Sequence, residues 1–263
     1  MKAVGIDIGS LTTKVIVMED NKILSSAIVD TGDDAEATAK QAMAQALEKT
    51  GASSSGDYYT VSTGIGGKSI SFSNQSKAIT TCLARGTCYL LPSARMVIDM
   101  GAESSTVVKL NERGRVVDWA NHDKCAAGTG IFLQQMAKLM QIPLEEMARL
   151  SLNAKGSADI TSTCAVFAES EVISHVHRDP PTPMSDIAAG IYSSVISRIM
   201  ALCKRVGIAK DVAVAGGVAL NVGLINILGK EMGFPVLLPE SPRFLTAVGA
   251  AIIARENIDK GLG

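Results

Sequence analysis

The sequence predicts an α/β protein built from two similar domains, because a pattern of strands followed by helices occurs twice along the chain. The segments 6–18 and 98–110 each contain an apolar run, an Asp-x-Gly triplet with small hydroxyl residues, and a second apolar run. Corresponding residues of the two copies are separated by the same number of positions, since 99 − 7 and 101 − 9 both equal 92. Two copies in register indicate a duplicated unit.

Each copy of the repeat predicts a β-hairpin with a glycine at its tip. In the first copy a polar turn follows at residues 19–22, a further strand is predicted over 23–29, and the alanine-rich segment 33–49 predicts a helix. We expect the first domain to span residues 1–93, with a C-terminal helix at about 244–258 packing back onto it.

The second copy opens the second expected domain, residues 94–263. A strand is predicted over 116–119, helices from residue 128 onward, and one long helix over 185–206. Residues 212–221 predict a buried strand, a pair of glycines and the start of a helix. We therefore expect two similarly built α/β domains that face each other across a cleft.

The two expected hairpin tips can hold a phosphate chain between them. Backbone N–H groups and hydroxyls at such tips bind phosphate oxygens, and the carboxylates of Asp7 and Asp99 can hold a magnesium ion. Asp-x-Gly is also an ordinary turn signal, but two copies in the same strand pattern favour a nucleotide site. The expected phosphate contacts are Gly9, Ser10, Thr12, Thr13 and Lys14 in the first copy and Gly101 and Ala102 in the second.

The paired glycines Gly216 and Gly217, followed by Asn221, are a third candidate element of the nucleotide site. Paired glycines let the backbone approach a flat ligand such as adenosine closely. A tight turn from strand to helix explains the same stretch, taken alone, equally well.

Residues 62–69 follow an expected strand and end in Gly-Lys-Ser, which invites comparison with a P-loop. The P-loop pattern requires glycine where Ser62 stands. A P-loop protein would also show a parallel βαβ pattern instead of tandem hairpins. We expect this segment to be a flexible loop of the first domain.

Cys125 and Cys164 each stand where a helix is expected to begin, with the helix then running back into the nucleotide-binding domain. A free cysteine is a common packing residue, but a helix N-terminus favours anions, including a thiolate. An iron–sulfur cube normally takes four cysteine ligands, so a second chain would have to supply the other two. Cys82, Cys88 and Cys203 lack this setting and are expected to be packing residues.

Composition narrows the class of protein. The chain has 263 residues, a formal net charge of −1 and mixed charges throughout, so nothing indicates a nucleic-acid or membrane-surface partner. No apolar run approaches the roughly 20 residues that a membrane-spanning helix needs, and the N-terminus turns polar too early for a secretory signal. Five cysteines without framework spacing argue against a disulfide scaffold, so we expect a cytoplasmic protein.

Four motifs that span nearly the whole chain are specific in combination. They are Asp-Ile-Gly-Ser-Leu-Thr-Thr-Lys from Asp7, Asp-Lys-Cys-Ala-Ala-Gly-Thr-Gly around Cys125, Ser-Thr-Cys-Ala-Val-Phe-Ala-Glu-Ser-Glu-Val-Ile-Ser around Cys164, and Ala-Gly-Gly-Val-Ala-Leu-Asn ending at Asn221. Together they resemble the activator ATPases of 2-hydroxyacyl-CoA dehydratases, a family that includes the ATPase subunits of benzoyl-CoA reductase. The two cysteine motifs separate this family from the wider superfamily of actin, sugar kinases and heat-shock chaperones.

The resemblance implies an α/β fold of two duplicated actin-like, ribonuclease H-like domains around a nucleotide cleft. It implies a dimer with one 4Fe–4S cluster on its axis, held by Cys125 and Cys164 of each subunit, and ATP or ADP with Mg²⁺ in each cleft. The reduced cluster would pass one electron to a partner enzyme, driven by ATP hydrolysis. The implied partners are a second copy or a paralogous ATPase subunit, an iron–sulfur acyl-CoA dehydratase or benzoyl-CoA reductase as acceptor, and reduced ferredoxin or flavodoxin as donor.

The chain departs from the family pattern at Glu103, where relatives most often carry glutamine. A glutamine there would orient the attacking water, and Glu103 can do the same or act as a base. With Asp7 and Asp99, Glu103 completes the expected catalytic set. The departure leaves open that the chain is one unlike half of a heterodimeric ATPase, as in benzoyl-CoA reductase.

Two other classes of protein compete with this interpretation. A sugar or acetate kinase of the same superfamily would need a substrate-binding insertion and a catalytic aspartate in the second half, and neither is found. A redox-sensing regulator that merely carries the cluster would need a DNA-binding or signalling module, for which no sequence remains.

Overall fold

The computed structural model describes residues 1–51, 57–122 and 129–262. The chain divides into two units, each of which is described by itself. Unit 1 comprises Met1–Val97, Leu110–Val117 and Pro239–Gly263, and unit 2 comprises Ile98–Lys109 and Asp118–Leu238.

The first sheet has five strands in the order β3-β2-β1-β4-β5. They are β1 (Lys2–Ile8), β2 (Thr12–Glu19), β3 (Lys22–Asp30), β4 (Tyr58–Gly64) and β5 (Gln75–Ser76). The strand β2 pairs antiparallel with both β1 and β3, whereas β4 runs parallel to β1. The hairpin predicted over 6–18 and the strand predicted over 23–29 are therefore confirmed.

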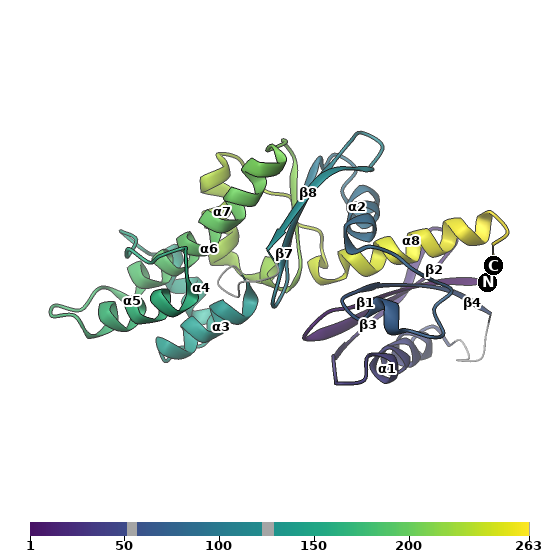
Figure 1. Cartoon of the computed structure of the whole chain (residues 1–263), viewed down its shortest axis with the longest axis horizontal. Helices are drawn as coiled ribbons and strands as arrows, with labels where there is room; N and C mark the ends of the chain where they lie inside the picture. The colour runs from purple at the N-terminus through teal and green to yellow at the C-terminus, as the bar shows by residue number, and fades with distance from the viewer. Residues whose placement is uncertain (52–56, 123–128, 263) are drawn as a thin grey trace. The chain divides into compact units, whose positions relative to one another are not determined.

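Two helices cover opposite faces of this sheet, α1 (Ala35–Glu48) on one and α8 (Leu245–Asp259) on the other (Figure 1). Side chains alternate along β1, so Val4 and Ile6 pack with the alanines of α1, while Ala3 packs with those of α8. The α8 backbone passes so close to β1 that a Cβ on Gly5 would overlap the carbonyl oxygen of Ala247 and the amide nitrogen of Ala251. The helix α2 (Ile79–Leu90) packs along α8.

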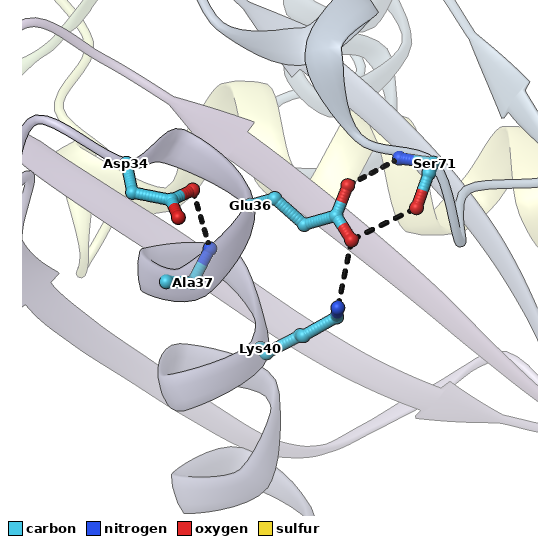
Figure 2. Close-up of polar contacts among 5 residues, drawn as sticks. All are labelled: Asp34, Glu36, Ala37, Lys40 and Ser71. Carbon is cyan, nitrogen blue, oxygen red and sulfur yellow. Dashed lines mark hydrogen bonds and ion pairs between the residues drawn. The ribbon is translucent and has the colours of Figure 1, made fainter.

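The start of α1 is fixed by two acidic side chains (Figure 2). Asp34 caps the helix, because its Oδ1 accepts from the amide of Ala37 at 3.0 Å. Glu36 accepts from Nζ of Lys40 at 2.7 Å and from the amide and hydroxyl of Ser71 at 3.0 and 2.8 Å. The bond from Lys40, followed by those from Ser71, lowers the pKa of Glu36 to about 2. These contacts confirm the predicted helix and attach the segment after β4 to it.

The segment 62–69 is not the loop that the sequence suggested. The strand β4 continues to Gly64, with Ser62 fully buried, and Gly67–Ser69 forms a single turn of 3₁₀ helix. The hydroxyl of Ser62 donates to the carbonyl of Gly67 at 2.6 Å. A Cβ on Gly66 would lie 2.7 Å from the side chain of Ile8. The pair Lys68–Ser69 therefore ends a packed turn. The first residues of the segment are buried by contacts with distant parts of the chain, which the local sequence does not reveal.

The second sheet has four strands in the order β8-β7-β6-β9, so its first three repeat the order of β3-β2-β1. They are β6 (Met96–Met100), β7 (Ser105–Leu110), β8 (Val116–His122) and β9 (Val212–Ala215). The predicted strands at 98–110 and 116–119 are confirmed, and β8 extends three residues further than expected. The duplication predicted from the sequence is therefore present in the strand order of the two sheets.

In the described part of unit 2, four α-helices lie between β8 and β9 in the chain, and a fifth follows β9 (Figure 1). They are α3 (Gly130–Leu139), α4 (Leu144–Leu152), α5 (Ala165–His177), α6 (Met184–Val206) and α7 (Val222–Met232). By length and composition α6 could cross a membrane, contrary to the expectation that no segment would qualify. It packs against α4 and α7 instead, and 72% of its most apolar window is buried. The long helix predicted over 185–206 is thus the core helix of unit 2.

Candidate functional site

Between β1 and β2 the chain turns through residues 9–12, here called the first tip. The amide of Gly9 donates to the carbonyl of Thr12 at 3.0 Å, which closes the turn. Leu11 is 44% exposed and Ser10 is half-buried. Among the described residues, the amides of Ser10 and Leu11 donate to no backbone carbonyl. These two N–H groups can therefore serve a ligand that carries oxygen acceptors.

Thr31, one residue past β3, binds the first tip from behind. Its hydroxyl donates to the carbonyl of Gly9 at 2.9 Å, and its amide donates to the carbonyl of Leu11 at 2.9 Å. The hydroxyl of Thr13, which is fully buried, lies 2.9 Å from that of Thr31. The sequence pattern did not single out Thr31, because it lies 22 residues from Gly9 and outside the Asp-x-Gly repeat.

Asp7 and Lys14 are partners across the β1–β2 ladder. The Lys14 Nζ lies 3.4 Å from Asp7 Oδ2, and the side chains are 15% and 12% exposed. A Cβ on Gly9 would meet the same ammonium at 3.0 Å. The positive charge of Lys14 therefore lies between the Asp7 carboxylate and the start of the first tip.

Residues 101–104, here called the second tip, repeat the geometry of the first. The amide of Gly101 donates to the carbonyl of Ser104 at 2.9 Å, and both positions lie 92 residues after their counterparts, since 101 − 9 and 104 − 12 agree. Glu103 is exposed at this tip, whereas Asp99 is half-buried near the end of β6. The predicted repeat is therefore confirmed down to single hydrogen bonds.

The first turn of α3 binds the second tip. The amides of Gly130 and Ile131 donate to the carbonyls of Gly101 and Ala102, both at 3.0 Å. The first amides of a helix have no partner inside the helix, and the second tip supplies one here. A Cβ on Gly130 would lie 3.2 Å from Cγ2 of Val218, so glycine lets the helix start this close. The link between α3 and the second tip is thus at the N-terminus of the helix.

The two paired glycines differ in their surroundings. Gly216 has a φ of 88°, and a Cβ there would overlap the carbonyl of Met100 and lie 2.6 Å from Oδ1 of Asp99. Gly217 is exposed, and no atom lies within 4 Å of a Cβ built on it. Packing therefore requires the first glycine, while the second borders open space.

Asn221 caps α7 and is engaged at both ends of its side chain. Its Oδ1 accepts from the amide of Leu224 at 3.0 Å, and its Nδ2 donates to the hydroxyl of Tyr192 at 2.9 Å. Burial raises the pKa of Tyr192 to about 12, so this hydroxyl stays protonated at neutral pH. In this arrangement Asn221 ties α7 to α6.

Cys164 is the N-cap residue of α5, as expected, and is half-buried. No side chain caps this helix start. The segment before Cys164 is held by α5 itself, because the amide of Thr161 donates to Oε2 of Glu171 at 2.6 Å and Nε2 of His175 lies 3.3 Å from the carbonyl of Asp159. The sulfur of Cys164 therefore stands on an anchored turn at the positive end of a helix.

The remaining cysteines have other settings. Cys125 lies outside the described residues. Cys82 and Cys203 are fully buried, and burial raises the pKa of each thiol to about 12, as fits packing residues. Cys88 is half-buried in α2. Within the described ranges, no three potential metal ligands of the His, Cys, Asp and Glu types gather at one point.

The structure thus brings the predicted residues together in one group in each unit. Asp7, Gly9, Ser10, Thr12, Thr13 and Lys14 form the group of unit 1, and Asp99, Gly101, Ala102, Glu103, Gly216 and Gly217 lie around the second tip in unit 2. Asn221 follows the second group at the start of α7, and Cys164 stands apart at the start of α5.

Comparison with known proteins gives matches over the whole chain. The profile of the BadF/BadG/BcrA/BcrD ATPase family matches residues 4–254. The activator of lactoyl-CoA dehydratase from Anaerotignum propionicum is 37% identical over 263 residues, which cover 99% of this chain and 100% of that protein. One subunit of benzoyl-CoA reductase from Thauera aromatica is 34% identical over 261 residues, covering 94% of this chain and 91% of its own length.

A solved structure is similar along the same length. It is the activator of the 2-hydroxyisocaproyl-CoA dehydratase from Clostridium difficile with bound ADPNP, which is 34% identical. The match covers 100% of this chain and 97% of that one with a TM-score of 0.91. The predicted fold class, two duplicated α/β domains of the actin-like type, is confirmed by this match and by the repeated strand order.

Proposed function

Since the chain belongs to the BadF/BadG/BcrA/BcrD ATPase family, we propose that it is an ATP-dependent activator that delivers one electron at low potential to a 2-hydroxyacyl-CoA dehydratase. The observation that carries the proposal is similarity over the whole length, at 34 and 37% identity, to two proteins named as activators of such dehydratases. The chain does no chemistry on the acyl-CoA itself.

The first tip in unit 1 and the second tip in unit 2 each carry groups that can bind the phosphates of ATP or ADP. The ADPNP in the Clostridium difficile structure supports nucleotide binding by this chain. The open amides of Ser10 and Leu11 and the hydroxyl of Thr12 bind phosphate oxygens, and the backbone of Gly101 and Ala102 does so from the second tip. The carboxylate of Asp7 in unit 1 and that of Asp99 in unit 2 are each a candidate magnesium ligand. Lys14 adds positive charge beside the first tip, and Gly217 is proposed to border the adenosine.

Hydrolysis is assigned to Glu103. Its carboxylate is exposed at the second tip, where it can orient or deprotonate the attacking water. The bond from the water oxygen to the γ-phosphorus forms as the bond to the bridging oxygen breaks, so the products are ADP and inorganic phosphate. Glutamate can do this as the glutamine of relatives does, or as a base, and the two roles are distinguishable by substitution.

Cys125 and Cys164 of each of two chains would together hold one 4Fe–4S cluster, which would supply the one-electron carrier. The setting of Cys164 fits such a ligand, because the residue is only half-buried, no side-chain cap occupies the start of α5, and the helix N-terminus favours a thiolate. When bound, the cluster supplies a one-electron carrier whose potential depends on exposure and hydrogen bonds to its sulfurs. Glu171 keeps the Cys164 turn in place through Thr161.

The proposed partners follow from the electron balance. One electron enters from reduced ferredoxin or flavodoxin and leaves to an iron–sulfur acyl-CoA dehydratase, so no net electron stays on the chain. The second subunit is another copy or a paralogous ATPase. Benzoyl-CoA reductase as the acceptor is the alternative, and it is favoured by the 34% identity to a subunit of that enzyme.

Iron analysis of anaerobically purified protein tests the assignment. One shared cluster gives about two iron atoms per chain and a brown colour, since the cube holds four irons. Cys164→Ser and Cys125→Ser should each remove the iron while nucleotide binding persists, and Cys88→Ser, in α2, is the matched control that keeps it. A brown Cys164→Ser protein with full iron content would overturn the cluster assignment.

Assays of kinase activity and of acceptor activation separate the proposed activator from a kinase and one acceptor enzyme from the other. A colourless protein that phosphorylates a sugar or acetate would instead be a kinase of the same superfamily. Purified 2-hydroxyacyl-CoA dehydratase and benzoyl-CoA reductase components, offered in turn with ATP and dithionite, decide between the two acceptors. Activation of the reductase alone would replace the dehydratase assignment.

A further inference from the structure

We infer that Thr31 is a positioning residue that sets the direction of the Ser10 amide, one of the two open amides of the first tip. The inference rests on the proposed nucleotide function and deepens it at one residue. Thr31 lies outside both the repeat and the motifs that carry the family resemblance.

The contacts of Thr31 reach both sides of the tip. Its hydroxyl donates to the carbonyl of Gly9 and its amide donates to the carbonyl of Leu11, each at 2.9 Å. The backbone on its other side is fixed as well, because the amide of Gly32 donates to the hydroxyl of Thr38 in α1 at 3.3 Å. Thr31 thus connects the tip to the edge of the sheet and to the helix that covers it.

Peptide geometry converts these contacts into a direction. The carbonyl of Gly9 and the amide of Ser10 belong to one planar trans peptide group, so they point in opposite directions. A hydroxyl that holds the Gly9 oxygen therefore aims the Ser10 N–H away from Thr31. The carbonyl of Leu11 shares a peptide group with the amide of Thr12, so the bond from the Thr31 amide orients the Thr12 N–H in the same way.

Counting the hydroxyl hydrogens of Thr31 and Thr13 shows which of the two donates to the other. A threonine hydroxyl has one hydrogen, and the hydrogen of Thr31 is used on the carbonyl of Gly9, which can only accept. Thr13 must therefore be the donor in the 2.9 Å contact between the two hydroxyls. Because Thr13 is fully buried, it supports Thr31 from behind the tip and does not present its hydroxyl to phosphate.

The second tip holds the equivalent carbonyl by other means. The carbonyl of Gly101, the counterpart of Gly9, accepts from the amide of Gly130 at the start of α3. In both copies this peptide oxygen is bonded, once by a hydroxyl and once by a helix amide. The shared feature is the fixed peptide group, which is what oriented phosphate donors require.

The test uses the full-length protein with Mg²⁺ and compares three variants. Thr31→Val keeps the branched shape and removes the hydroxyl, Thr31→Ser keeps the hydroxyl, and Thr50→Val is the control. The Thr50 hydroxyl also donates to a backbone carbonyl of unit 1, that of Leu47 at 2.7 Å, but at the end of α1. Calorimetry measures binding of AMPPNP and of adenosine, and amide hydrogen exchange follows the bonded amides of Gly9 and Thr31 without ligand.

Thr31→Val should weaken AMPPNP binding about tenfold, the scale of one lost hydrogen bond, and leave adenosine binding nearly unchanged. Exchange at the hydrogen-bonded amides of Gly9 and Thr31 should become faster. Thr31→Ser should restore both, and Thr50→Val should change neither. If Thr31→Val does not fold, Thr31→Ala removes the same hydroxyl with less bulk.

Three results would overturn the inference. Unchanged AMPPNP affinity and exchange in Thr31→Val would show that the hydroxyl does not set the tip. An equal loss for AMPPNP and adenosine would show a general loss of structure. A parent protein that binds neither ligand would overturn this inference and the proposed function together, which distinguishes that failure from the first two.

Discussion

The ammonium of Lys14 lies 3.4 Å from the carboxylate of Asp7, across the β1–β2 ladder and beside the first tip. Both side chains are largely shielded from water, at 15% and 12% exposure. A charge in such a place depends on its partner, because water replaces the lost interaction only in part. The pair therefore links the stability of unit 1 to its proposed phosphate and magnesium contacts.

Replacing Lys14 should lower both the stability of unit 1 and its affinity for MgATP. Lys14→Met leaves the Asp7 carboxylate without its cation and should lower the free energy of unfolding by about 1–3 kcal/mol, between the values for exposed and buried pairs. Affinity for MgATP should fall as well. Urea unfolding and calorimetry measure the two effects. The exposed pair Arg149–Glu146 is the control, and Arg149→Met should cost less than about 1 kcal/mol.

Glu103 should control hydrolysis more than binding. We expect Glu103→Ala to slow ATP hydrolysis by about a hundredfold while MgATP affinity changes little. Glu103→Gln separates the two possible roles, since glutamine can orient water but cannot accept its proton. Recovery in the glutamine variant indicates orientation, and no recovery indicates a base. Hydrolysis by Glu103→Ala at the parent rate would remove Glu103 from the mechanism.

The paired glycines should respond differently to alanine. Gly216→Ala places a methyl group against the carbonyl of Met100 at a positive φ, so we expect a loss of at least about 2 kcal/mol in unfolding free energy. Gly217→Ala meets no atom within 4 Å and should leave stability unchanged. If Gly217 borders the adenosine, its alanine variant should nevertheless bind ATP more weakly. Equal thermal stability of the two variants would contradict the packing argument.

ATP and ADP should change the cluster differently. The segment containing Cys125 precedes Gly130, whose amide is bonded to the second tip, so a change at that tip reaches the start of α3. We expect the cluster's redox potential, its accessibility to chelators and the affinity for the acceptor to differ between the two nucleotides. For one electron a shift of about 59 mV is a tenfold change in equilibrium, which redox titration resolves.

By linkage, acceptor binding should alter nucleotide affinity by the same factor. Gly130→Ala presses on Val218 and should shift the start of α3, which reduces the difference between the two nucleotide states. Identical titrations, chelation rates and acceptor affinities with ATP and ADP would reject coupling, even with the cluster and ATPase both present.

Glu36 should make unit 1 sensitive to acid. The bonds from Lys40 and Ser71 lower the pKa of Glu36 from an ordinary 4.5 to about 2, so its stabilising contribution is present above pH 4.5. That contribution is lost as the pH falls toward 2, because the folded state then takes up a proton that the unfolded state has already bound. In urea unfolding, Glu36→Gln should be less stable than the parent at pH 7 and approach it near pH 2. A difference that is constant with pH would contradict this origin.

Local patterns were sufficient for the framework of the fold. The repeat predicted two hairpins with glycine tips, and the same hydrogen bond closes both, from Gly9 to Thr12 and from Gly101 to Ser104. The start of α5 at Cys164 was predicted as well, and the helix begins there. The ligand contacts assigned to these residues stay predictions.

What the sequence did not reveal depends on contacts between distant segments. Thr31 reaches Gly9 across 22 positions, and nothing in its neighbourhood marks it. Ser62 begins a segment that resembles a loop but is buried against the turn at Gly67. The sequence showed no long uninterrupted apolar run in α6, because polar residues are spaced along it. The mean hydropathy of the helix is nevertheless high, and most of its apolar window is buried.

The bonds between α3 and the second tip have a consequence for charge distribution. The carbonyl of Gly101 shares a peptide group with the amide of Ala102, and the carbonyl of Ala102 shares one with the amide of Glu103. Each carbonyl is already polarised by a helix amide, so the N–H at the other end of its peptide group is a stronger donor. An anion that takes those N–H groups strengthens the bonds to α3 in return. Two rigid peptide groups are thus dipoles in series between the open N–H groups of the tip and the start of α3, so an anion bound at the tip would polarise the helix start without a change in backbone conformation.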